Sequence, residues 1–154
     1  MPGRITRGAL AGAVGALALD ATSYLDMLVR GRPPSDLPGQ VAGRLAQQSG
    51  FELGAGEQAG HRRSALGALL GYATGVAVGA AYGVVLGRRR GGPLAGRAIA
   101  VGTVMMAAGT VPLTSMGLTD PREWGTAGWL ADIIPHAAYG MATALAYEAL
   151  GATN

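Results

Sequence analysis

The sequence contains no cysteine, no lysine and only one phenylalanine among its 154 residues. Without cysteine the chain can form no disulfide, no thiolate metal site and no cysteine nucleophile, so two histidines and nine acidic residues remain as candidate chemical groups. All 12 basic residues are arginines, and they gather in short clusters rather than along one continuous face. This distribution argues against a nucleic-acid-binding domain.

Apolar residues and glycine dominate instead. Hydrophobic residues make up 49% of the chain, 27 residues are glycine, and the mean hydropathy is +0.29, which excludes a disordered chain as the main interpretation. Glycine weakens a helix in water by up to about 1 kcal/mol per residue, but between membrane helices it lets two backbones approach closely. The composition therefore fits a lipid environment better than water.

Four long apolar segments occur, at residues 8–29, 65–87, 98–119 and 124–150. Each is long enough to cross a hydrocarbon core of about 30 Å at about 1.5 Å per helical residue, so the sequence predicts four transmembrane helices. The second segment carries no charge and is flanked by arginines on both sides. The first segment could instead be a cleaved signal peptide, because Ala16-Leu17-Ala18 resembles a cleavage site.

Short connections place sequential helices side by side, so the predicted fold is all-α. We expect one integral membrane domain over residues 1–154: an antiparallel four-helix bundle with both termini on one side of the membrane. Six arginines fall on each side, so their number alone does not orient the chain. The dense run Arg88, Arg89 and Arg90 favours cytoplasmic termini, and anionic lipid headgroups could also bind there.

The first connection is the only long one. Leu37, Val41 and Leu45 recur every four residues, which predicts a short amphipathic helix over residues 36–49, on the bundle or in the headgroup layer. Residues 51–60 are rich in glycine, and we expect a flexible return there. Later in the chain, residues 120–123 read as a capping box that would start the last helix.

Glycine follows a strict four-residue spacing through the second segment. Each step of four advances by about 40° around a helix, so the stripe winds by roughly 200° and its two ends should face different partners. Those partners are either helices of the same chain or, at one end, a second copy of the chain. The glycine stripe consists of Gly67, Gly71, Gly75, Gly79, Gly83 and Gly87.

Three ionisable residues fall well inside apolar segments, where such groups are candidates for function by default. Asp20 and Asp132 lie at matching depths, roughly 12 to 14 Å from the long-loop side, and His136 lies one turn deeper than Asp132 on the same helix face. Tyr24 and Tyr139 lie one turn from Asp20 and His136 and could offer hydroxyl groups. These five residues form the predicted polar intramembrane site.

Two interpretations of this site remain open. Its members could simply hydrogen-bond to one another and fix the helices, or a carboxylate beside a histidine could pass protons near neutral pH. Pro135 and Pro112 each leave a helical carbonyl free nearby, which adds polar groups to the same region. No metal is expected, because one histidine and two carboxylates lack a recognised ligand spacing.

Two stretches resemble a known group of proteins. One is DATSYLDM at residues 20–27, followed by RGRP at 30–33, and the other is WLAD at residues 129–132 with Pro135-His136 and Tyr139-Gly140. They resemble small, uncharacterised multi-pass membrane proteins of high-GC actinobacteria. The resemblance covers the first and last helices, and it implies a cell (inner) membrane location without an assigned activity.

Two functional hypotheses follow from the sequence. In the first, the chain is a non-enzymatic accessory or interaction protein that packs through its glycine stripe. In the second, it is a small proton-coupled conduit or transporter that uses Asp20, Asp132 and His136. We expect neither a cofactor nor an enzymatic activity, because no serine, cysteine or metal motif has a catalytic spacing.

Overall fold

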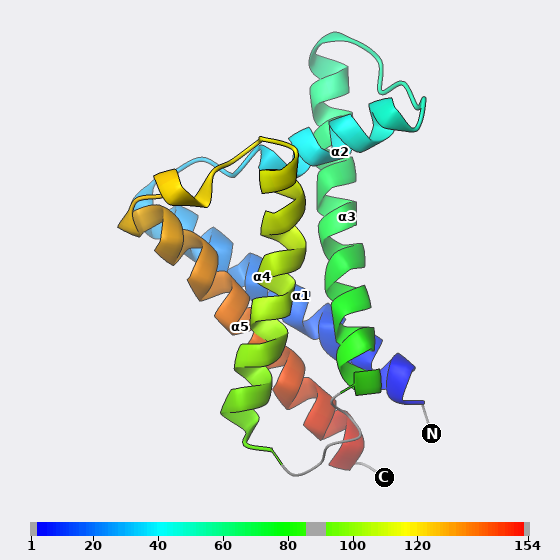
Figure 1. The fold of residues 1–154 in the computed structure, drawn as a ribbon, viewed down its shortest axis with the longest axis vertical. Helices are drawn as coiled ribbons and strands as arrows, with labels where there is room; N and C mark the ends of the chain where they lie inside the picture. The colour runs from blue at the N-terminus through cyan, green and yellow to red at the C-terminus, as the bar shows by residue number, and fades with distance from the viewer. Residues whose placement is uncertain (1–2, 86–91, 153–154) are drawn as a thin grey trace.

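The computed structural model describes residues 3–85 and 92–152 of the chain, and within these ranges every regular element is helical. Four long helices and one short one occur, together with a single 3-10 turn (Figure 1). The elements are α1 (Arg4–Arg30), α2 (Leu37–Gln48), α3 (Gly56–Val85), α4 (Leu94–Ser115), η1 (Pro121–Glu123) and α5 (Thr126–Ala152). The long helices coincide with the four apolar segments to within a few residues at most ends.

The main difference lies at the start of α3, which begins at Gly56. The expectation of a flexible return was therefore wrong for residues 56–60. The first turns of α3 hold polar residues with adequate helix propensity. Nε2 of His61 lies 3.5 Å from Oε1 of Glu57, one turn earlier on the same helix. A hydropathy pattern locates the apolar part of a helix, whereas its polar extension into water leaves no such signal.

The start of α5 was also predicted wrongly. The carboxylate of Asp120 does accept a hydrogen bond from the backbone N–H of Arg122, at 2.9 Å, but the helix that it caps is η1. The chain then continues in an extended conformation at Trp124, and α5 begins only at Thr126. A capping box specifies one helical turn, and whether that turn continues depends on the residues that follow.

Three of the helices, α1, α3 and α4, are long and apolar enough to cross a membrane. The remaining long helix, α5, has 27 residues, but Asp132, Pro135 and His136 interrupt its apolar sequence, and it is not among these three. On length and composition, the residues that the structure describes therefore support three membrane-spanning helices rather than the expected four.

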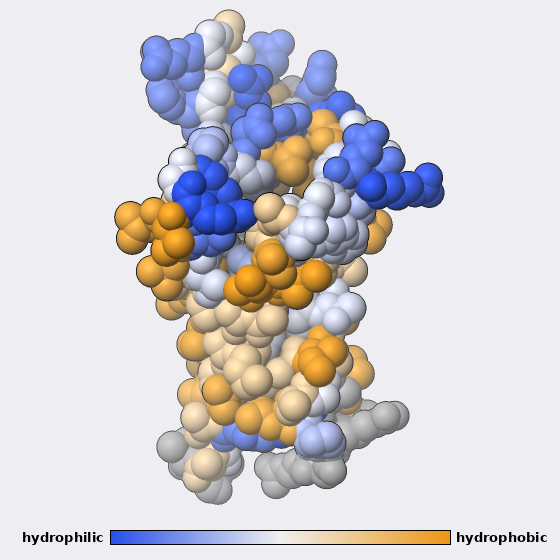
Figure 2. Space-filling model, turned by 90° about the vertical axis from the view of Figure 1, so that its left-hand side faces the viewer, coloured by the Kyte–Doolittle hydropathy of each residue, from blue (hydrophilic) through white to orange (hydrophobic). Residues whose placement is uncertain are grey.

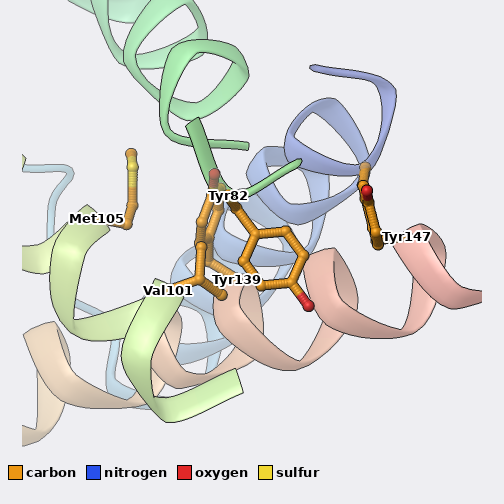
Figure 3. Close-up of a cluster of buried hydrophobic side chains, with 6 residues drawn as sticks. Tyr82, Val101, Met105, Tyr139 and Tyr147 are labelled. Atoms are coloured by element: carbon orange, nitrogen blue, oxygen red, sulfur yellow. The ribbon is translucent and has the colours of Figure 1, made fainter. Parts of the chain in front are cut away.

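The helices pack mainly as antiparallel pairs around α1, which contacts both α3 and α5, while α4 packs on α5 (Figure 1). Consecutive helices are not always neighbours, since α3 contacts α4 only sparsely. The short helix α2 lies across α3 near the end remote from both termini. The core holds three tyrosines besides small and aliphatic residues: Ala11, Tyr82, Val101, Met105, Tyr139 and Tyr147 (Figure 3).

Large apolar side chains also cover much of the outer surface. Figure 2 shows an apolar band along the bundle, with hydrophilic residues gathered at the end that carries α2. The most exposed apolar side chains include Leu28 at 78%, Val29 at 82% and Ile99 at 70%. Arg44 of α2 donates a hydrogen bond to the carbonyl of Met116 and so connects α2 to the end of α4.

Candidate functional site

The glycine stripe on α3 contacts α1 through its second half. A Cβ atom on Gly79 would lie 2.6 Å from the backbone nitrogen of Gly12, and one on Gly12 would lie 2.9 Å from the Cα of Gly79. Gly75 lies against Ala16, and Gly83 lies against the carbonyl of Arg4. At the point of closest approach the two backbones leave no room for a side chain on either helix.

The first half of the stripe faces a different neighbour. A Cβ atom on Gly67 would lie 2.7 Å from the nitrogen of Gly39 in α2. Between the two contacts, Gly71 has no atom within 4 Å of its Cβ position. The stripe thus meets two helices of the same chain, with an uncovered stretch between them, while Gly87 lies outside the described residues.

The partner glycines on α1 were not singled out from the sequence. Gly8 and Gly12 share the four-residue spacing of the stripe and are followed by Ala16, so a small-residue pattern was present in the first apolar segment. A second close approach joins α4 to α5, where a Cβ atom on Gly140 would lie 3.0 Å from the Cα of Gly102. Each of these glycines has an alanine four residues away, Ala98 or Ala144, so a short small-residue pattern was present here too.

Two tyrosines of α5 reach across α1 to the stripe. The hydroxyl of Tyr139 donates to the carbonyl of Gly75 at 2.6 Å, and that of Tyr147 donates to the carbonyl of Gly83 at 3.3 Å. Both pairs are separated by 64 residues, as expected for helices that run parallel. Gly15 of α1 makes room for this arrangement, because a Cβ atom there would lie 2.8 Å from the ring of Tyr139.

These contacts place Tyr139 in the core rather than in the expected polar group. Its side chain is fully buried, and its ring lies between α5 and α3 (Figure 3). Next to it, Thr143 is also fully buried, and its hydroxyl has no hydrogen-bond partner among the described residues. We therefore assign Tyr139 to helix packing.

Asp20 pairs with a residue that the sequence did not suggest. Its carboxylate accepts a hydrogen bond of 2.5 Å from the hydroxyl of Tyr72 on α3, and this pair lies at an exposed position. Tyr24 lies one turn further along α1 and is 62% exposed. Just beyond the glycine contact, α1 and α3 therefore carry a carboxylate and two phenols on an open surface.

Asp132 and His136 form a separate polar pair on α5. Nδ1 of His136 lies 2.7 Å from the backbone carbonyl of Asp132 and 3.4 Å from its carboxylate oxygen Oδ1. Thr110 of α4 lies beside this carboxylate, but Oδ2 is buried and accepts no hydrogen bond within the described part of the chain. No hydrogen bond or ion pair among the described residues joins this pair to Asp20.

The five residues predicted as one polar site thus fall into three places. Two lie on the open α1–α3 surface, two lie between α5 and α4, and Tyr139 lies in the core. Residues on different helices at equal depth can still face different neighbours. Within ranges 3–85 and 92–152, no group of three or more histidine and acidic side chains is arranged to hold a metal ion.

Charged and aromatic side chains gather at the end of the bundle where α1 begins and α5 ends. The guanidinium of Arg7 lies over the ring of Tyr147, 4.0 Å from its centroid, and Arg97 forms an ion pair with Glu148. The rings of Tyr82 and Tyr147 meet edge to face with centroids 5.2 Å apart. The arginine run at residues 88–90, expected to bind lipid headgroups, lies outside the described residues.

The opposite end has a hollow of about 1130 Å³ between α2, the loop after it and the start of α3, lined by both polar and apolar residues. Arg44 and Arg63 line it together with Asp36 and Glu52, so its charges balance.

Comparison of the chain with known protein families, with curated protein sequences and with solved structures finds no match in any of the three. The function of this protein therefore has to be inferred from its own residues and their geometry.

Proposed function

We propose that the chain is a multi-pass protein of the cell (inner) membrane that acts as a non-catalytic accessory or interaction subunit. In this proposal α1, α3, α4 and α5 all span the bilayer, α2 lies in the headgroup layer, and the termini are cytoplasmic. The exposed apolar surface carries the argument, since side chains such as Leu17, at 63%, and Val111, at 62%, would face water in a soluble protein.

The packing of α5 supports a fourth span. Contacts with α1 run from Arg30 beside Ala127 at one end to Arg7 beside Gly151 at the other. A helix that packs antiparallel along a spanning helix from end to end occupies the same depth of the bilayer. Its polar residues Asp132 and His136 also interact with each other, which lowers the cost of placing them there.

Membrane fractionation tests the embedding. After washing with alkaline carbonate, the protein should stay with the membrane pellet and should be released only by detergent. Recovery in the aqueous supernatant without detergent would refute the proposal, because a bundle with this apolar surface could then be soluble.

The absence of cysteine offers a direct test of topology. Single cysteines introduced as Gly3→Cys and Ser35→Cys lie at exposed positions at opposite ends of α1. In intact cells an impermeant maleimide should label only the second variant, and both should react after the membrane is opened. The reverse pattern would place the termini outside, and labelling of both in intact cells would refute a spanning α1.

The interaction itself is assigned to the uncovered part of the glycine stripe. Gly71 has free space above it, and it is flanked by Leu69, 65% exposed, and Tyr72, 44% exposed. A small residue on an open helix face allows a further membrane helix to approach closely. Gly71→Leu should reduce the mass of the complex extracted in mild detergent, whereas Gly109→Leu, at an equally open glycine of α4, should not.

A proton-coupled conduit is the second candidate, and the buried free oxygen of Asp132 beside His136 favours it. Proton flux into vesicles containing the purified protein should then fall in Asp132→Asn and in His136→Ala. Asp36→Asn is the control, because Asp36 lies outside the spanning helices. Flux equal to that of protein-free vesicles, or unchanged in both variants, would exclude this candidate.

A further inference from the structure

We propose that the guanidinium of Arg7 binds a phosphate-bearing anion at the end of the bundle where α1 begins and α5 ends. This inference deepens the proposed function, because a lipid headgroup can reach the site only if the bundle is embedded in a membrane. The site is distinct from the arginine run at residues 88–90, and its geometry lies wholly within described residues.

Arg7 differs from the other partly buried arginines in lacking a counter-charge. Arg97 pairs with Glu148, and Arg32 pairs with Asp26 at 2.6 Å. No acidic side chain among residues 3–85 and 92–152 pairs with Arg7, and its buried Nε atom has no hydrogen-bond acceptor there. A cation that is partly removed from water without an anion is unfavourable, and a bound anion would remove that cost.

The surroundings of Arg7 hold its guanidinium in place. The ring of Tyr147 covers one face at 4.0 Å, and this ring is fixed in turn by the hydrogen bond to Gly83 and by the edge-to-face contact with Tyr82 (Figure 3). A planar group held in this way loses little entropy when it binds a ligand.

Gly151 makes room for the same group. A Cβ atom at this position would lie 2.7 Å from Nη1 and 3.1 Å from Cζ of Arg7. Only glycine therefore lets the guanidinium lie against α5 at this point. A guanidinium held in one plane can donate paired hydrogen bonds to phosphate oxygens. Arg4, exposed one turn earlier on α1, adds positive charge on the approach to the site.

The class of ligand follows from this geometry and position. A stacked guanidinium without an acidic partner matches a phosphate, whose oxygens accept two parallel hydrogen bonds. The site lies where the spanning helices end, which is the depth of phospholipid headgroups. An anionic phospholipid and free inorganic phosphate offer the same chemistry, so the experiment has to separate them.

Native mass spectrometry of the protein released from nanodiscs measures retained lipid. Nanodiscs of phosphatidylcholine with phosphatidylglycerol should yield wild-type protein with one retained anionic lipid. Arg7→Gln should lower this retention by about tenfold, because one charge-assisted contact is lost. The control Arg122→Gln makes the same charge change at an exposed position of η1 and should retain lipid like the wild type.

Two further arms separate the possible outcomes. Arg7→Lys keeps the charge but not the paired donors, so its retention should lie between those of wild type and Arg7→Gln, and circular dichroism should show unchanged helix content. Inorganic phosphate added in detergent should not displace the lipid if a headgroup is the ligand, and displacement would identify a free-anion site. Equal lipid retention by wild type and Arg7→Gln, or an equal loss of lipid in Arg122→Gln, would overturn this proposal. The proposed membrane location would still stand in that case if the protein remains in the membrane pellet.

Discussion

Gly79→Ala tests the close contact between α1 and α3 with the smallest possible change. The added methyl group would lie 2.6 Å from the backbone nitrogen of Gly12, whereas ordinary van der Waals contacts begin at 3.4 Å. The atoms that the methyl group would meet belong to the backbone of α1, so no side-chain rotation can relieve the overlap. The helices have to separate by about 1 Å, which weakens the attraction of each contact along the interface by a quarter to a half.

The expected loss of stability follows from two opposing effects. Overpacking at a tight contact costs up to about 3 kcal/mol, while replacing glycine by alanine inside a helix favours folding by up to about 1 kcal/mol. We therefore expect the free energy of unfolding to fall by about 2 kcal/mol. Reversible unfolding in mixed detergent micelles, followed by circular dichroism, measures this change.

Gly71→Ala is the matched control, because it makes the same substitution in the same stripe where no atom lies within 4 Å. Its free energy of unfolding should stay unchanged or rise by up to about 1 kcal/mol. If Gly79→Ala were as stable as the wild type, or if both variants lost the same stability, the close approach of α1 to α3 would be refuted.

Two further substitutions examine the other contacts. Tyr139→Phe keeps the buried ring but removes the hydrogen bond to Gly75, so the free energy of unfolding in detergent should fall by about 1 kcal/mol. Tyr24→Phe, at an exposed position, should not change it, and equal effects of the two substitutions would contradict the buried contact. Gly140→Ala should separate α4 from α5 and lower the thermal midpoint by several degrees, while Gly109→Ala should not. A stable Gly140→Ala protein would mean that these two helices do not touch through their backbones.

The helices themselves were largely readable from the sequence. Continuous apolar segments and the four-residue pattern around Val41 predicted the four long helices and α2, because hydrophobic period and helix type are local properties. The errors fell at polar ends, as at Gly56, where helix and loop differ little in composition. The four-span interpretation remains a prediction, since only α1, α3 and α4 have a continuous stretch that is long and apolar enough to cross a membrane.

The polar residues were much harder to group. Equal depth suggested that Asp20 and Asp132 would meet, but depth gives only one coordinate of a side chain in a membrane. Tyr72, the partner of Asp20, was not considered because it lies within an uncharged segment and has no motif around it. The hydroxyl of Tyr139 was expected near His136, yet it spans α1 to reach Gly75, a contact that only three packed helices create.

The sequence by itself determined that the chain is helical and apolar, and that one helix carries a row of small residues. These properties depend on residue type and spacing along one helix, which the order of amino acids specifies directly. Only the tertiary structure decided which helix fills each part of the glycine stripe, and that Arg7 stacks on Tyr147 without an acid beside it. Such pairings depend on the rotation and crossing of whole helices, and these are set by the combined packing of all their neighbours.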